Sequence, residues 1–223
     1  MKIIFTGGKI WALGLALLFG FAHRGSSQIT VVSNLPTLQT ALQSSPLITN
    51  FGTNVTINLT TVGETLQISQ NVTIDAGTNF VLFEGNNVTR LFNVRAGARL
   101  TLRNLQLHGG VSTNGGAIYS AGTLVISNCV LYGNSATNAS GVNGVNNDDS
   151  SGDGSSATSG LSAAGAAIYS RGPVTILYSI LTNNTVSAGS GGNGGNGAST
   201  GFVFGGNGGN GGSGGSAAGA ALY

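Results

Sequence analysis

Apolar and polar residues alternate over short runs along most of the chain. The runs from Leu100 to Leu102, from Leu124 to Ile126 and from Val174 to Ile176 each carry an apolar residue at every second position. This alternation is the pattern of a half-buried β-strand. Glycine, asparagine and serine separate the runs, and these residues favour turns. The pattern therefore predicts many short strands joined by tight turns.

The strand pattern also repeats along the chain. The stretch NGGAIYSAGTLVISNCVLYGN (114–134) returns fifty positions later as AGAAIYSRGPVTILYSILTNN (164–184), and LTLRNLQLHGG (100–110) and VTIDAG (72–77) are earlier, partial copies. A unit of about two dozen residues cannot bury its apolar row alone, but stacked units place like residues over like at the ~4.8 Å spacing of neighbouring strands. The predicted fold class is all-β, a right-handed parallel β-helix.

The alignment of the copies fixes a register between neighbouring coils. The expected pairs are Val72 with Leu100, Ile74 with Leu102, Leu100 with Leu124, Leu102 with Ile126, Leu107 with Leu131, Leu124 with Val174, Ile126 with Ile176, Leu131 with Leu181, and Asn134 with Asn184. Asn104 falls on Asn128, where two interpretations stay open: an internal ladder of hydrogen-bonded amides that ends at Tyr178, or two asparagines in ordinary turns. Gly115 and Gly116 are expected at a backbone bend that has little room for a side chain.

Three parts of the chain do not follow the strand pattern. Residues 35–43, LPTLQTALQ, have apolar residues at helical spacing after a proline, which predicts a short helix that caps the N-terminal end of the solenoid. Residues 135–164 and 187–218 are rich in glycine, asparagine and serine, a composition typical of flexible loops. The final residues, 219–223, restart the repeat without a capping element, so the sequence is expected to be a fragment.

The first residues predict export. Lys2 and Lys9 precede an apolar run from Ile10 to Ala22, which is typical of a secretory signal peptide at residues 1–27. Without this leader the chain carries five arginines and six acidic residues, so its formal charge changes from +2 to about −1. A nucleic-acid partner is therefore not expected. No transmembrane segment is expected after the leader, and the single cysteine excludes an internal disulfide.

Few residues suggest chemistry. The carboxylates of the strand region, Glu64, Asp75 and Glu84, form no close sequence pair, although a glycoside hydrolase needs two facing carboxylates. Asp148, Asp149 and Asp153 are a weak calcium candidate, for which a solvated loop is the favoured interpretation. His108 has no evident partner and Cys129 aligns with core positions, so we predict no catalytic residue and no cofactor. Four arginines form one further group of charged side chains: Arg90, Arg95, Arg99 and Arg103. If they share one outer face, they would bind an anionic polysaccharide. Otherwise they are solvated positions between inward apolar residues.

Two motif pairs resemble a known family. GGAIYS with LYGN, and GAAIYS with LTNN, are similar to the G-G-A-I and F-x-x-N motifs of the bacterial polymorphic outer-membrane proteins. The matching positions are Gly115, Gly116, Ala117, Ile118, Leu131 and Asn134 in the first copy, and Gly165, Ala166, Ala167, Ile168, Leu181 and Asn184 in the second. Leucine replaces the phenylalanine in both copies. The resemblance implies a β-helix displayed on a cell surface and a role in adhesion.

The expected protein is a non-enzymatic, exported, adhesin-like scaffold at the surface of a bacterium or outside it, which contacts host or cell-surface proteins or polysaccharides through its strand faces and loops. A truncated, polysaccharide-active enzyme similar to pectate lyase is the alternative. The expected organisation is a signal peptide (1–27), cap and first strands (28–65), coils (66–134), a flexible loop (135–164), a coil (165–186), a glycine-rich loop (187–218) and the start of a further coil (219–223).

Overall fold

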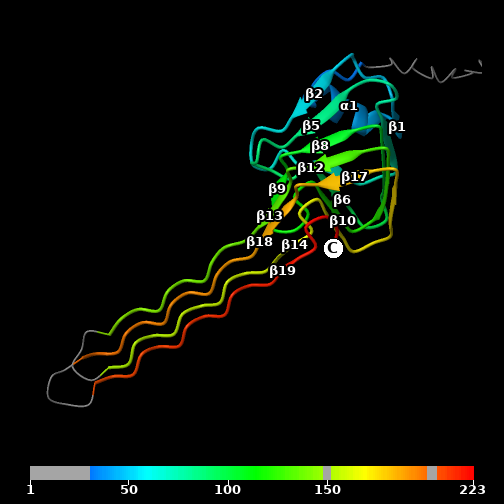
Figure 1. The fold of residues 1–223 in the computed structure, drawn as a ribbon. Helices are drawn as coiled ribbons and strands as arrows, with labels where there is room; N and C mark the ends of the chain where they lie inside the picture. The colour runs from blue at the N-terminus through cyan, green and yellow to red at the C-terminus, as the bar shows by residue number, and fades with distance from the viewer. Residues whose placement is uncertain (1–30, 148–151, 200–204) are drawn as a thin grey trace, which may run out of the picture.

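The structure is a computed structural model that describes residues 31–147, 152–199 and 205–223. These residues form parallel β-sheets with one short helix, and a long rod projects from one side of the body (Figure 1). The all-β, parallel character expected from the sequence is therefore confirmed. The expected signal peptide at residues 1–27 lies outside the described residues.

Three parallel sheets make up the body. The first sheet is ordered β1 (Leu47–Ile48), β4 (Val72–Asp75), β7 (Arg99–Arg103), β11 (Thr123–Ser127) and β16 (Val174–Leu177). The second is ordered β3 (Leu66–Ile68), β6 (Phe92–Val94), β10 (Ile118–Ser120) and β15 (Ile168–Ser170). The third is ordered β2 (Val55–Asn58), β5 (Val81–Glu84), β8 (Gln106–His108), β12 (Val130–Tyr132) and β17 (Ile180–Thr182). From β4 onward the chain contributes a strand to the first, the third and then the second sheet, and then returns to the first. Each such coil of the chain therefore lies on the coil before it.

Two smaller sheets lie where the rod leaves the body. One contains β9 (Val111–Ser112), β13 (Ser135–Thr137) and β18 (Thr185–Ser187), and the other contains β14 (Ala163–Ala164) and β19 (Ala217–Ala218). Both are parallel. The base of the rod thus continues the hydrogen-bonded stacking of the body.

The register expected from the repeat is confirmed at the strand pairs. Ile74 pairs with Leu102, Leu102 with Ile126, and Ile126 with Ile176. On the third sheet Leu107 pairs with Leu131, and Leu131 with Leu181. The paired aliphatic residues therefore form columns, each of which extends through several successive coils.

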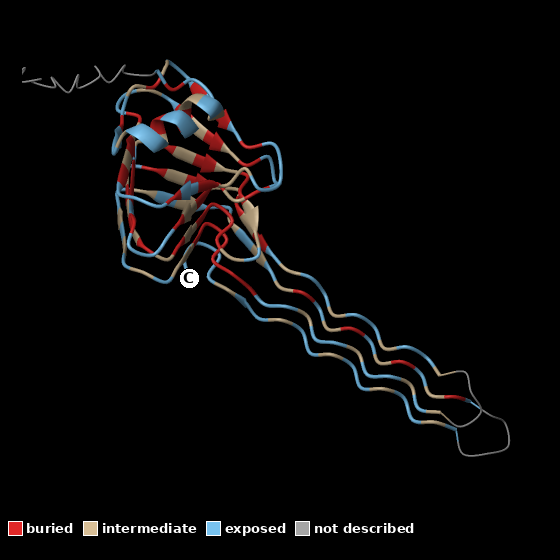
Figure 2. Cartoon of the chain, turned by 180° about the vertical axis from the view of Figure 1, so that it is seen from behind, coloured by how far each residue is buried: buried red, intermediate tan, exposed pale blue. Residues whose placement is uncertain are grey.

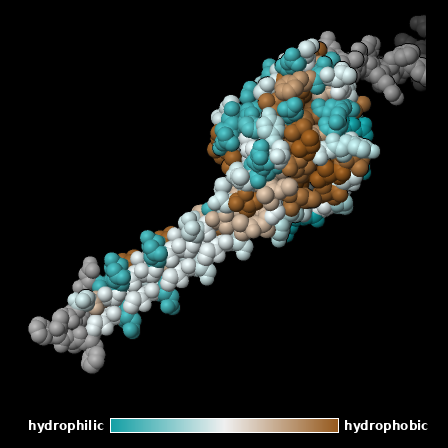
Figure 3. Space-filling view, viewed as in Figure 1, coloured by the Kyte–Doolittle hydropathy of each residue, from teal (hydrophilic) through white to brown (hydrophobic). Residues whose placement is uncertain are grey.

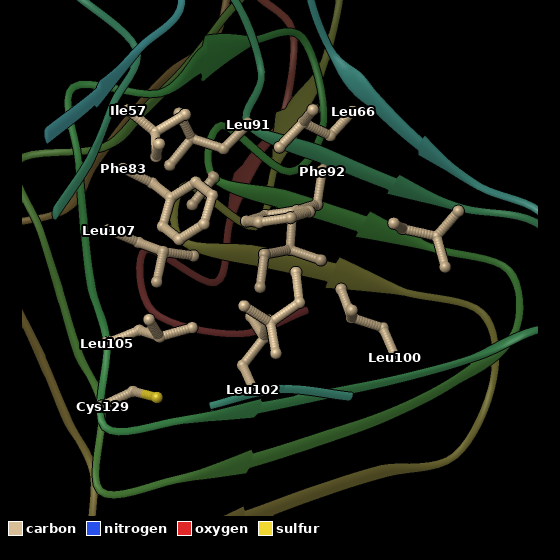
Figure 4. Packing of buried hydrophobic residues seen from close by; sticks show 14 of the residues in the cluster. Ile57, Leu66, Phe83, Leu91, Phe92, Leu100, Leu102, Leu105, Leu107 and Cys129 are labelled. Carbon is tan, nitrogen blue, oxygen red and sulfur yellow. The ribbon is translucent and has the colours of Figure 1, made fainter. Parts of the chain in front are cut away.

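These columns fill one continuous hydrophobic core. Leu102 and Ile126 are fully buried, and Ile176 is partly buried against the same cluster. Phe83 and Phe92 meet inside it with ring centroids 5.0 Å apart (Figure 4). Cys129 lies in this core beside Leu105 and Leu102 (Figure 4), and burial raises the pKa of its thiol. The cysteine thus fills space in the core, as its alignment with core positions predicted.

The expected helix is present as α1 (Leu35–Ser44). The Asn34 side chain accepts a hydrogen bond from the Thr37 backbone N–H, and the Thr37 hydroxyl accepts one from the backbone N–H of Asn34. This reciprocal pair satisfies amides that have no partner within the first turn. Leu38 and Ala41 are buried in the common core, so the helix packs on the body where the stack of strands begins (Figure 1).

The glycine-rich segments differ most from expectation. Their described residues form four extended chains, 138–147, 152–162, 189–199 and 205–216, which lie side by side as the rod (Figures 1 and 2). Backbone N–H groups of Gly189, Gly192 and Gly195 donate to Leu161, Thr158 and Ser155 at 2.9–3.1 Å. The segments expected to be flexible loops are therefore an ordered, hydrogen-bonded bundle.

The bundle repeats every three residues, which is the period of the polyproline II helix. Glycine is required where the chains meet, because a Cβ atom on Gly192 would lie 2.5 Å from the carbonyl carbon of Val142 and one on Gly195 would lie 3.0 Å from the Asn146 nitrogen. Between these contacts, short polar side chains point outward, seen as patches along a pale surface (Figure 3). The triplets G-G-N and G-G-S thus provide close approach and a polar surface together.

Candidate functional site

The G-G-A-I motif forms a tight corner of the body. Gly115 has φ of +69° and Gly165 has φ of +63°, a backbone region that glycine adopts without a steric cost. A Cβ atom on Gly116 would lie 2.6 Å from the carbonyl oxygen of Ala166 and 2.7 Å from that of Gly110. The remaining motif residues of both copies are buried: Ala117, Ile118, Ala166, Ala167 and Ile168. The motif therefore shapes the backbone and carries no exposed chemistry.

The asparagines of the second motif form a buried ladder. Asn134 is fully buried, and its Oδ1 accepts a hydrogen bond from the Gly110 N–H at 2.9 Å while its Nδ2 donates to the Leu107 carbonyl at 3.2 Å. Asn184 lies one coil further on. Its Oδ1 accepts from Asn134 Nδ2 at 3.0 Å, and its own Nδ2 donates to the Leu131 carbonyl at 3.0 Å. The two side chains thus fasten three neighbouring coils at the same corner.

We expect Asn134→Ala to lower the free energy of unfolding by about 2 kcal/mol, because a buried Gly110 N–H and the Leu107 carbonyl lose their partner. Urea denaturation followed by circular dichroism measures the change. Asn128→Gly is the matched control, since Asn128 is an exposed asparagine with φ of +53° that glycine tolerates. Equal losses in the two variants would contradict a special role for the buried ladder.

The second amide pair lies at the surface. Asn128 Nδ2 donates to Asn104 Oδ1 at 2.6 Å, and Asn104 Nδ2 donates to Asp75 Oδ1 at 2.6 Å. Both asparagines also occupy left-handed turn positions, with φ of +53° and +57°. The two interpretations left open by the sequence are thus each partly correct: the amides do bond to one another, but in turns at the surface, where Asn128 is exposed and Asn104 is half-buried. The row ends at Tyr178, which is 90% exposed.

The calcium candidate consists of Asp148, Asp149 and Asp153. Asp148 and Asp149 lie outside the described residues. Asp153 lies in the rod, where its Oδ1 accepts a hydrogen bond from the Asn207 backbone N–H at 2.6 Å. Within the described part of the chain, no three His, Cys, Asp or Glu side chains lie close enough together to hold a metal ion.

A carboxylate–imidazole pair was missed by the sequence analysis. Glu84 on β5 lies directly beside His108 on β8, with 2.6 Å between Glu84 Oε2 and His108 Nδ1. The Tyr132 ring packs on the imidazole with centroids 4.5 Å apart. Glu84 and His108 are 24 residues apart in the sequence, which equals the repeat offset. This spacing is the sequence signal that indicates their contact. The three side chains form one outward-facing row on the third sheet.

A stack of tyrosines occupies the outer face of the second sheet. Tyr119 and Tyr169 lie in register, with ring centroids 5.5 Å apart and planes 8° apart, and Tyr223 continues the stack at 5.3 Å. Arg90 covers the other end, with its guanidinium carbon 5.2 Å from the centre of the Tyr119 ring. Arg90 also donates from Nε to the Gly115 carbonyl and from Nη2 to the Asn114 carbonyl. Partial burial lowers the pKa of this guanidinium.

The remaining arginines are exposed, and three of them share one corner. Arg95 begins the turn that leads to Arg99 at the start of β7, and Arg171 occupies the equivalent turn two coils further on. Arg103 lies at the far end of β7, opposite Asp75. Of the four arginines considered in the sequence, Arg95, Arg99 and Arg103 are therefore exposed on or beside the first sheet, whereas Arg90 holds a different corner together.

No protein-family model, curated protein or solved structure matches the chain. Among the residues that the structure describes, no helix is long and apolar enough to cross a membrane.

Proposed function

We propose that the chain is an exported, right-handed parallel β-helix that works as a non-enzymatic, adhesin-like scaffold at a bacterial cell surface. The resemblance of its two motif pairs to those of polymorphic outer-membrane proteins supports this role. The regular outer faces of the sheets and the projecting rod (Figure 1) offer extended surfaces for contact with other molecules.

The observation that carries the proposal is the state of the described carboxylates, each of which is engaged in local hydrogen bonds. The Glu64 carboxylate accepts from the backbone N–H groups of Thr61 and Thr60, which lowers its pKa. Asp75 accepts from Gly77 N–H and Asn104 Nδ2.

The other two described carboxylates are engaged in the same way. Glu84 bonds to His108 and to the Asn86 N–H, and Asp153 accepts from the Asn207 N–H. Asp75 ends a strand of the first sheet and Glu84 ends a strand of the third. Hydrolysis of a glycosidic bond needs two carboxylates that face the same bond, so this arrangement favours a scaffold.

A turnover assay tests the proposal. We expect no unsaturated product when the protein is incubated with polygalacturonate in the presence of calcium and the ultraviolet absorbance is followed. An active pectate lyase serves as the positive control. Steady product formation that scales with protein concentration would overturn the scaffold and establish the polysaccharide-active alternative.

A further inference from the structure

We propose that an acidic polysaccharide, a polymer of uronic acids, binds along the outer face of the second sheet and the arginine corner beside it. This site is defined by Asn93, Tyr119, Tyr169, Arg95 and Arg171. The inference rests on the scaffold proposed above and names the class of its partner.

The first part of the site is a column of polar and aromatic side chains. Asn93, Tyr119 and Tyr169 are directly opposite one another on β6, β10 and β15, so they recur at about 4.8 Å along the stack. Tyr119 and Tyr169 are half-buried, and their hydroxyls have no hydrogen-bond partner among the described residues. Asn93 Nδ2 donates to Gln67 Oε1 at 2.8 Å, so the amide oxygen of Asn93 is the group that can accept from a ligand. The phenol groups both donate and accept hydrogen bonds, which suits the hydroxyl groups of a sugar.

The second part is a parallel column of positive charge. Arg95 follows Asn93 by two residues and Arg171 follows Tyr169 by two, so the arginines lie beside the first column. They are two coils apart, about 10 Å at the usual strand spacing. The coil between them has Ala121 and Gly122 at this turn, so its side chains do not extend past a methyl group.

The arginines of this corner are available to a ligand. Arg95, Arg99 and Arg171 are exposed and have no ion pair or side-chain hydrogen bond within the described ranges. The described Asp and Glu side chains lie elsewhere, on the far ends of β4 and β5, in the loop before β3, and in the rod. The corner therefore carries uncompensated positive charge in a chain that is nearly neutral as a whole. Guanidinium groups bind carboxylates through paired hydrogen bonds.

The combination of the two columns favours a polysaccharide over a nucleic acid. A nucleic acid needs a wide basic surface to neutralise its phosphates, whereas this corner offers three arginines. The tyrosine rings stack on one another, so their faces are not free to receive bases. A polymer with hydroxyls along its length and a carboxylate at intervals matches both columns at once.

Binding can be measured by isothermal titration calorimetry with polygalacturonate at low ionic strength. We expect saturable binding, and fully methyl-esterified polygalacturonate, which has the same backbone without charge, should bind at least tenfold more weakly. Arg95→Gln/Arg171→Gln should reduce the affinity for the charged polymer about tenfold, and the corresponding double lysine variant should recover part of it.

The controls separate a built site from general charge. Thr56→Glu/Thr182→Glu on β2 and β17 changes the net charge by the same two units at exposed positions of the third sheet, which is separate from the second sheet and its arginine corner, and its affinity should stay within twofold of the parent. Tyr169→Ala should weaken binding while leaving the charge unchanged. Equal loss in the third-sheet variant, equal binding of the neutral polymer, tighter binding of duplex DNA, or no binding at all would each overturn the inference. Product formation in the turnover assay would instead overturn the scaffold while leaving the binding site intact.

Discussion

Replacing Ile126 by aspartate should lower the free energy of unfolding by about 4 kcal/mol, the largest effect that we expect from any single substitution in the body. Ile126 is fully buried between Leu102 of one coil and Ile176 of another. A carboxylate at this position has no partner. It must either be buried as a charge or be protonated, and both lower the stability of the folded state. Urea unfolding monitored by circular dichroism measures the loss.

Val125→Asp provides the matched control. Val125 precedes Ile126 on β11, and it faces the outside between Thr101 and Thr175. The aspartate can reach water there, and the loss should stay below about 1 kcal/mol. If the two variants unfold at the same urea concentration, the aliphatic columns do not form the core in the described register.

The register of the body could be predicted because the repeat leaves little freedom. Apolar residues two apart must face the same side, and a slip of one residue would move Leu102 and Ile126 to the solvent. The match between the copies therefore determines the pairs from the sequence alone. The helix at 35–44 was predictable for a similar reason. A proline at its start favours a helix, and the spacing of its leucines places them on one face that can be buried.

The rod could not be predicted by the same reasoning. Its chains contain too few apolar residues to form a core, and low apolar content is the usual sign of disorder. They are held instead by backbone hydrogen bonds between closely packed glycines, a mode that leaves no hydrophobic pattern. The signal that was present is the three-residue period of glycine in GGNGGNG and GGNGGNGGSGGS.

The surface features were missed because they depend on pairs of residues from different coils. Glu84 and His108 are 24 residues apart, and Tyr119 and Tyr169 are 50 apart. Each residue taken alone is an ordinary outward-facing side chain. The repeat offset relates outward positions in the same way as inward ones, so it is the sequence signal that connects both pairs.

Replacing Gly195 by alanine should open the rod without unfolding the body. A Cβ atom here would collide with the Val145 carbonyl and lie 3.0 Å from the Asn146 nitrogen. Gly195 also donates to Ser155 at 2.9 Å and accepts from Gly209 at 2.7 Å. Moving its backbone therefore strains contacts to three chains at once, and we expect a loss of about 2 to 3 kcal/mol in the local stability of the rod.

Amide hydrogen exchange distinguishes this local opening from general unfolding. The N–H groups of Gly192, Gly195 and Gly209 should exchange about 30-fold faster or more in Gly195→Ala, because 1.4 kcal/mol of lost protection corresponds to a factor of ten. The amides of β7 and β11 should keep the protection of the parent, since the sheets have their own core.

Gly208→Ala tests whether the effect comes from close packing or from the loss of a glycine as such. The nearest atom to a Cβ on Gly208 is the Gly195 carbonyl oxygen at 3.6 Å, which is ordinary contact. This variant should exchange like the parent, although it lies in the same triplet pattern and on the chain next to Gly195. Fast exchange in both variants would mean that the rod requires the backbone freedom of its glycines. Fast exchange in Gly195→Ala alone would show that the rod depends on the close approach of its chains.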